Sequence, residues 1–178
     1  DTLPALPDPT TDLTDPQLVK RRADVEEKHR RVVEFLDEHK YDGILLRRSD
    51  SIAWFTAGGD LTRCLSSDWG TVALFVSRTC RAVITDNVQS ARVFEEELAG
   101  LGFQLKERPW YEDPVRFQTQ ITHGKKIASD DRFASLPYEF ERLRNLRWPM
   151  TPLERQWMRE LGRTLTLSVE ATCRNFMP

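Results

Sequence analysis

Two adjacent glycines and two adjacent large aromatic residues occur together in the segment SDSIAWFTAGGD, residues 49–60. Paired glycines can hold a phosphate when they join a strand to the N-terminus of a helix. Gly58 and Gly59 instead follow a short expected helix, and the segment has neither a G-x-G-x-x-G nor a G-K-[ST] pattern. We therefore interpret the glycines as a helix end and tight turn, with Trp54 and Phe55 in the core.

Paired carboxylates in the segment SDD, residues 129–131, could act as general acid and base. They follow a short expected strand, where a turn with a helix cap is the competing interpretation. A small-molecule α/β enzyme that uses these carboxylates is an alternative hypothesis. Trp110 and Tyr111 are interpreted as core or edge contacts.

Potential metal ligands and nucleophiles are scattered along the chain. They comprise three histidines and three cysteines: His29, His39, His123, Cys64, Cys80 and Cys173. No H-E-x-x-H, C-x-x-C or G-x-S-x-G pattern is present, so the sequence predicts no metal site and no catalytic residue in this chain. Each histidine is expected to be hydrogen-bonded or exposed to solvent, and only Cys64 has an adjacent cation.

The elements that would position these residues alternate between helices and strands. Helices are expected over 16–39, 52–55, 88–102, 113–124 and 136–146, with strands over 41–48, 70–77, 81–86, 103–108 and 125–130. With one hairpin at 77–81, this alternation predicts an α/β fold with a mixed β-sheet flanked by helices.

The helix over 16–39 has the clearest signals. Asp15 and Pro16 fit an N-cap followed by proline in the first turn. Six residues at helical spacing are predicted to form its buried stripe: Leu18, Val25, His29, Val32, Val33 and Leu36. The remaining charged residues are expected to form a solvated face.

Composition excludes several function classes. The chain has 178 residues, of which 39% are hydrophobic and 30% charged, with a net charge of −2. This balance is typical of a soluble globular domain and offers no basic surface for nucleic acid or an anionic membrane. No apolar run reaches the roughly 18 residues of a membrane span. With no disulfide pattern, we expect a cytoplasmic protein with reduced thiols.

The order of the segments resembles the N-terminal domain of the creatinase, Xaa-Pro aminopeptidase and prolidase family of pita-bread metallopeptidases. An Arg-bearing helix precedes Asp-Gly at 42–43 and a strand. SIAWFTAG, residues 51–58, stands where the family has Asn-Ile-Tyr-Tyr-Leu-Thr-Gly-Phe. An apolar hairpin over 71–85 and the acidic segment 95–97 follow, so the resemblance covers about residues 17–150. It implies a creatinase N-terminal domain-like fold with a ribonuclease H-like motif.

The last segment also fits the family. Thr151, Pro152 and Glu154 match a capping box, and in this family such a helix opens the C-terminal catalytic domain. The chain is expected to have three parts: a flexible leader over 1–15, a creatinase/prolidase-type N-terminal domain over 16–150, and over 151–178 a linker helix opening a catalytic domain that is absent here.

The resemblance implies a non-catalytic N-terminal domain of an Xaa-Pro peptidase, inactive alone, that contributes to a homodimer and to the wall of the partner subunit's cleft. Its partners would be its own catalytic domain, a second copy and a short peptide substrate, with no nucleic acid and no membrane. This chain would hold no cofactor, and two divalent metal ions (Mn, Co or Zn) would belong to the catalytic domain. The alternatives are a free-standing interaction module and the N-terminal domain of a creatinase-like amidinohydrolase, since Trp54 and Ala57 depart from the family phrase.

The resemblance also directs two segments toward the partner's active site, the loop over 58–69 and the turn over 87–92. We expect Arg63 and Arg92 to bind a peptide carboxylate and Trp69 to form an apolar wall. The competing interpretation is that both arginines are ordinary solvated charges and that Trp69 belongs to the core.

Overall fold

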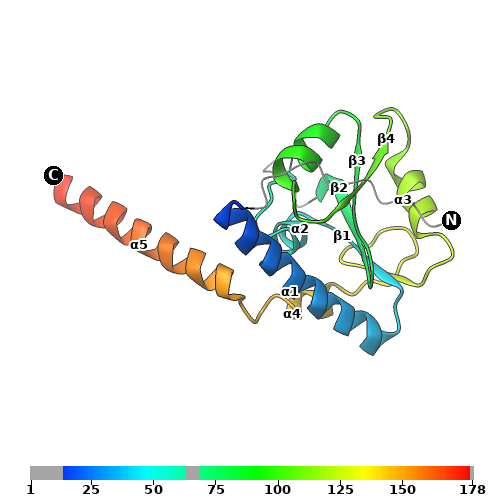
Figure 1. Ribbon diagram of the computed structural model, residues 1–178, viewed down its shortest axis with the longest axis horizontal. Helices are drawn as coiled ribbons and strands as arrows, with labels where there is room; N and C mark the ends of the chain where they lie inside the picture. Colours follow the sequence, from blue (N-terminus) through cyan, green and yellow to red (C-terminus); the bar gives the residue numbers. More distant parts are fainter. Residues whose placement is uncertain (1–13, 63–68, 177–178) are drawn as a thin grey trace. The chain divides into compact units, whose positions relative to one another are not determined.

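A computed structural model describes residues 14–62 and 69–176, and the chain divides into two compact units, Asp1–Trp148 and Pro149–Pro178. The elements of the first unit alternate between helices and strands (Figure 1). In chain order they are α1 (Pro16–His39), β1 (Gly43–Arg48), α2 (Ser49–Phe55), β2 (Trp69–Ser77), β3 (Arg81–Asp86), η1 (Arg92–Glu97), β4 (Gln104–Arg108), α3 (Pro114–Thr122), β5 (Ile127–Ser129) and α4 (Phe140–Asn145). The expected leader lies mostly outside the described residues, so its flexibility stays a prediction.

The five strands form one mixed sheet in the order β4-β3-β2-β1-β5. The central pairs, β1 with β2 and β2 with β3, are antiparallel, whereas β3 with β4 and β1 with β5 are parallel. Both parallel pairs follow crossover connections, which parallel neighbours need. The predicted mixed sheet flanked by helices is therefore confirmed.

Side chains alternate between the two faces of the sheet, and both faces are covered. On one face Leu45, Phe75 and Ile84 form a core with Phe133, against which Phe117 and Ile121 of α3 pack. On the other face α1 packs on β2, and α2 packs on β1 and β2 (Figure 1). Continuous apolar runs such as those of β1 and β2 are typical of strands buried on both faces.

The prediction that α1 carries its charges only on a solvated face is wrong. The helix has the expected bounds, and the Asp15 side chain caps it by accepting a hydrogen bond from Gln17 N at 2.9 Å. Asp24 and Lys28, however, are 3% and 1% exposed. Because Lys28 is three residues from Val25 and four from Val32, it lies within the apolar stripe of the helix.

The helix expected over 88–102 is much shorter. The helix in this segment is η1, a π-helix over Arg92–Glu97. After it the chain turns through Gly100 and Gly102, which both have positive φ (70° and 73°). Asp86 holds the turn before η1, since its Oδ1 accepts hydrogen bonds from Val88 N and Gln89 N, whereas η1 itself has no side-chain cap. The helix thus ends before either glycine, and a hydrogen bond from Leu101 N to Leu98 O closes the turn that follows, where glycine adopts the positive φ at little cost.

The second unit contains the helix α5 (Pro152–Asn175), which begins with the predicted capping box. The Thr151 Oγ1 accepts a hydrogen bond from Glu154 N at 3.2 Å, and the Glu154 carboxylate accepts one from Thr151 N at 2.8 Å. Among the described residues, no helix combines the length and apolar character needed to cross a membrane.

Candidate functional site around α2

The helix α2, which contains the two aromatic residues, is fixed at its N-terminal end by a distant carboxylate. Asp130, fully buried after β5, accepts hydrogen bonds from Arg47 N at 2.8 Å and Arg48 N at 3.2 Å. Burial, with a smaller contribution from the neighbouring Asp131, raises the pKa of Asp130 to about 6, although these hydrogen bonds act in the opposite direction. Asp130 therefore holds the junction between β1 and α2.

The second carboxylate of the SDD segment is also engaged. Asp131 pairs with Arg47 Nη1 at 2.8 Å and accepts a hydrogen bond from the Ser129 hydroxyl at 3.1 Å. The Arg47 guanidinium in turn lies 4.1 Å from the centre of the Phe133 ring. Both carboxylates thus have structural partners, which favours the competing turn-and-cap interpretation over a small-molecule active site.

Two cations of α1 bind carbonyl groups at the C-terminal end of α2. Lys28 Nζ donates to Trp54 O at 2.7 Å, and Arg21 Nη2 donates to Thr56 O at 3.3 Å and to Glu97 O at 2.9 Å. Trp54 O also accepts a hydrogen bond from Ala57 N at 3.3 Å, so Lys28 adds a second, shorter bond at this helix end. Burial lowers the pKa of Arg21, and the nearby Glu97 charge opposes this shift.

An ion pair supports Lys28 within the core. Its ammonium lies 2.6 Å from Asp24 Oδ2, with both side chains 1% exposed, and 5.7 Å from the centre of the Trp54 ring. Phe55 is fully buried, as predicted, and it contacts Phe103 edge to face. Trp54 is only half-buried. The sequence interpretation missed the ion pair, although the i,i+4 spacing of Asp24 and Lys28 within the apolar stripe was a usable signal.

After α2 the chain turns sharply into the loop over 58–69, which was expected to face the partner's active site. Ala57 and Gly58 have positive φ values of 53° and 84°. Gly59 packs so closely on Thr56 that a Cβ would lie 2.9 Å from its Oγ1. The backbone thus requires glycine or strained residues here, which agrees with the predicted helix end and tight turn.

The first part of this loop is held by η1. Arg92 Nη1 donates to Asp60 O at 2.8 Å, and its Nη2 donates to Thr62 O at 3.4 Å. Asp60 N donates to the Glu97 carboxylate at 3.0 Å. Hydrogen bonds from Thr62 lower the pKa of the Asp60 side chain. The segment up to Thr62 is therefore positioned by specific polar contacts.

The three predicted substrate contacts are placed to different degrees. Arg92 begins η1, is about one-third exposed, and lies beside the segment that leads to Arg63. Arg63 itself lies outside the described residues. The backbone of Trp69 begins β2 opposite Arg48, but its side chain is also outside what the structure describes. Contact of these residues with a substrate remains a prediction.

An exposed aromatic pair differs from its sequence interpretation. Trp110 and Tyr111 are 66% and 73% exposed and contact each other edge to face at 6.0 Å between ring centres. Arg108 beneath them is buried and donates from Nη1 to the carbonyls of Pro109, Trp110 and Glu112. The pair therefore projects from a loop that a buried guanidinium holds in place.

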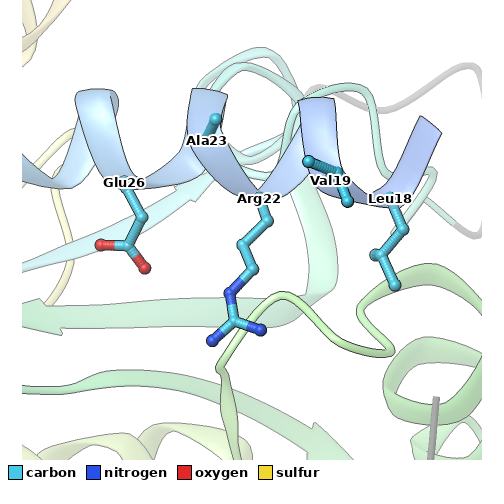
Figure 2. Close-up of a pocket in the computed structure, with 5 residues that line it drawn as sticks. All are labelled: Leu18, Val19, Arg22, Ala23 and Glu26. Atoms are coloured by element: carbon cyan, nitrogen blue, oxygen red, sulfur yellow. The ribbon is translucent and has the colours of Figure 1, made fainter. Parts of the chain in front are cut away.

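A shallow pocket of about 270 Å³ lies along α1 (Figure 2). Leu18, Arg22 and Glu26 point the same way along the helix in this view. All the lining residues belong to this one helix, and Glu26 is already paired with Arg81 at 2.7 Å. The pocket is thus a surface groove. Across residues 14–62 and 69–176, no group of three or more His, Cys, Asp or Glu could hold a metal ion.

Comparison with protein-family models found no match, and neither did comparison with curated proteins. Solved structures do match. The prolidase from Pyrococcus horikoshii OT3 has a TM-score of 0.59 at 10% identity, covering 85% of this chain and 43% of that chain. The dipeptidase PepE from Mycobacterium ulcerans has a TM-score of 0.58 at 13% identity, covering 76% of this chain and 39% of that chain.

The chain has a creatinase N-terminal domain-like fold. A solved creatinase/prolidase N-terminal domain, from an X-Pro dipeptidase of Streptococcus pyogenes, also matches, with a TM-score of 0.48 and 11% identity over 68% of this chain and 98% of that one. The matches to the prolidase and to PepE, both with TM-scores above 0.5, confirm the fold that the sequence resemblance implied. The chain spans less than half the length of the prolidase and of PepE.

Proposed function

We propose that this chain is the non-catalytic N-terminal domain of an Xaa-Pro peptidase, a hydrolase whose two divalent metal ions are held by a separate catalytic domain. The observation that carries the proposal is the agreement in fold with a prolidase over 85% of this chain and 43% of that enzyme. Because the described residues contain no metal-ligand group, Mn, Co or Zn would be bound outside them.

Within this proposal, the domain contributes to a cytoplasmic homodimer and to the wall of the partner subunit's substrate cleft. The segment from Gly58 to Thr62 supports this role, because Arg92 and Glu97 hold its backbone in one position. A wall that narrows a cleft excludes folded proteins and admits short peptides. The arginines would select peptides by their carboxylate.

A second candidate is a free-standing interaction module. The exposed pair Trp110 and Tyr111 favours it, because aromatic residues on a fixed loop are typical anchors of protein interfaces.

The gene sequence following Pro178 separates the two candidates. A downstream segment of roughly domain size with Asp, Asp, His, Glu and Glu metal ligands would support the peptidase, and an immediate stop codon would support the module. The purified chain itself is expected to hydrolyse no Xaa-Pro dipeptide with or without Mn²⁺, Co²⁺ or Zn²⁺, measured by proline release. Metal-dependent turnover by this chain would contradict the assignment.

The cleft-wall role predicts a kinetic effect in the full-length gene product. Arg63→Ala and Arg92→Ala should each raise KM for short peptides with a smaller change in kcat, because they remove binding that is uniform along the reaction. Arg78→Ala is a matched control, since Arg78 pairs with Asp37 and lies on the hairpin turn between β2 and β3. Normal kinetics in both test variants would rule out the role.

A further inference from the structure

A cavity of about 500 Å³ opens on the sheet face that carries α3. Strands β2, β3 and β4 provide its floor, and the end of α3 and the turn after it provide one side. Its lining includes Phe75, Cys80, Gln104, Lys106, Ile121 and Lys125. The volume falls within the range of roughly 300–1,000 Å³ that is usual for small-molecule sites.

The cavity arises from small side chains on the sheet. Ala82 lies between Phe75 on β2 and Gln104 on β4 in the strand register. Because the side chain of Ala82 is only a methyl group, it leaves open volume between its two larger neighbours. Gly43 borders Phe75 on the other side, where a Cβ would lie 2.8 Å from the ring. Phe75 and Ala82 are 5% and 2% exposed, so they form a closely packed apolar base beneath the cavity.

Two ammonium groups border this apolar base. Lys106 is half-buried, and among the described residues its amine has no hydrogen-bond or ion-pair partner. Lys125 Nζ donates one hydrogen bond to Ile121 O at 3.3 Å and lies 5.1 Å from the centre of the Phe75 ring. The one acidic lining residue, Asp42, already accepts a hydrogen bond from the backbone of Lys126 at 2.7 Å.

The side chain of Cys80 lines the same cavity. It is half-buried and donates to Gln104 Oε1 at 3.5 Å. Burial raises the pKa of this thiol, and the charges of Lys106, Lys125 and Arg81 oppose that shift. These cations therefore create a positive electrostatic potential at the sulfur atom. The lining carries two cations, Lys106 and Lys125, against one carboxylate, Asp42, so an anionic group in the cavity would meet a net positive charge.

We propose that this cavity binds a small molecule with an apolar ring and one carboxylate. The ring would lie over the apolar base of Phe75 and Ala82 and beside Ile121, where its own apolar surface is removed from water. The carboxylate would lie between the ammonium groups of Lys106 and Lys125, which attract an anion without imposing a fixed bonding geometry. The site is independent of the cleft-wall role and of any metal.

The test compares two probes of the same shape, 2-naphthoate and its neutral counterpart 2-naphthamide. Titrations of the full chain are followed by amide ¹H–¹⁵N shifts. We expect changes confined to residues near 80–82, 104–106 and 121–125, with the acid binding about tenfold tighter than the amide. Equal affinity for the two probes, or shifts spread over other surfaces, would overturn the proposal.

Variants test the two cations directly. The double variant K106A/K125A should bind 2-naphthoate about as weakly as wild type binds 2-naphthamide. Arg22→Ala is the matched control, because it removes an exposed cation from the α1 groove on another surface. Undiminished binding by the double variant would overturn the proposal.

Cysteine alkylation gives a second readout that needs no variant. Saturating 2-naphthoate should slow the alkylation of Cys80 several-fold, followed by peptide mass spectrometry at mildly alkaline pH. Cys173 is exposed in α5 and serves as the internal reference. Slowing of both thiols, or of neither, would contradict occupation of the cavity.

Discussion

Lys28 and Lys106 lie on opposite sides of the sheet and have opposite surroundings. Lys28 is 1% exposed, paired with Asp24, and bound to the Trp54 carbonyl. Lys106 is half-buried at an open cavity, and within the described part of the chain its amine has no such partner. One ammonium group is therefore a component of the fold, and the other is available to a ligand.

The same contrast extends to neighbouring residues. On the α1 side Arg21 binds the carbonyls of Thr56 and Glu97, and the His29 ring lies 2.7 Å from the Ser77 carbonyl. These side chains join α1 to α2 and the sheet. On the α3 side Lys106 borders the open cavity, and Lys125 donates one hydrogen bond, to Ile121 O. The number of charged residues alone therefore does not locate a binding site; what matters is whether their hydrogen bonds are already made within the fold.

The largest expected effect comes from removing the buried lysine. Lys28→Met leaves the Asp24 carboxylate buried without its cation, so the free energy of unfolding should fall by about 3–5 kcal/mol. Urea unfolding at neutral pH measures this.

A paired substitution separates charge from packing. Replacing both partners, as Asp24→Leu with Lys28→Met, should recover most of the lost stability, because an apolar pair needs no counter-charge. Arg30→Ala, which removes exposed pairs with Glu27 and Glu34, should lower stability far less than Lys28→Met, because exposed ion pairs contribute little. If the double variant is as unstable as the single one, the ion pair is not the cause.

A smaller effect should follow from the buried carboxylate Asp130. Its pKa of about 6 in the folded chain exceeds the ordinary value of about 3.9, so the folded state holds this proton more tightly than the unfolded state. The resulting stabilisation is present below about pH 4 and is lost as the pH rises to about 6, a change of about 3 kcal/mol.

Asp130→Asn should remove this pH dependence. Relative to wild type, the variant should gain stability between about pH 4 and pH 7, on top of a constant loss from one missing acceptor for Arg47 N or Arg48 N. Urea unfolding across this range measures the difference in stability between the two proteins. Hydrogen bonds from Arg30 and Arg31 lower the pKa of Glu27 to about 2, but this residue affects both proteins equally and so does not contribute to the difference. Parallel profiles for the two proteins would show that Asp130 stays charged in the fold.

The smallest effect is expected at the cavity. Lys106→Ala should change the free energy of unfolding by no more than about 0.5 kcal/mol, because its amine stabilises no described group. Thermal unfolding followed by circular dichroism, run beside Lys28→Met, measures this. A loss comparable with that of Lys28→Met would erase the contrast between the two lysines.

Elements with strong local signals could be predicted from the sequence. The bounds of α1 follow from Asp15 and Pro16, and α5 begins where Thr151 and Glu154 form their capping box. The strand over 81–86 was also predicted with its bounds. In each case the decisive interactions join residues only a few positions apart.

The features that could not be predicted depend on contacts distant in sequence. Asp130 binds the β1–α2 junction 82 and 83 residues away, which no local pattern indicates. Arg92 was selected as a substrate contact, but its bonds to the loop 30 and 32 residues earlier emerge only from the fold. The cavity at Lys106 was missed because it forms only when β4 joins the sheet beside β3.

The position of β4 at the edge of the sheet has a further consequence. An edge strand offers unpaired backbone groups to any other strand, which is a route to aggregation. The sequence of β4 includes Lys106 and the exposed Glu107, and such charges oppose edge-to-edge pairing. At the opposite edge β5 is bordered by the segment 137–139, through hydrogen bonds between Ser129 N and Pro137 O and between Glu139 N and Ser129 O. Strand addition is thus disfavoured at both edges of the described sheet.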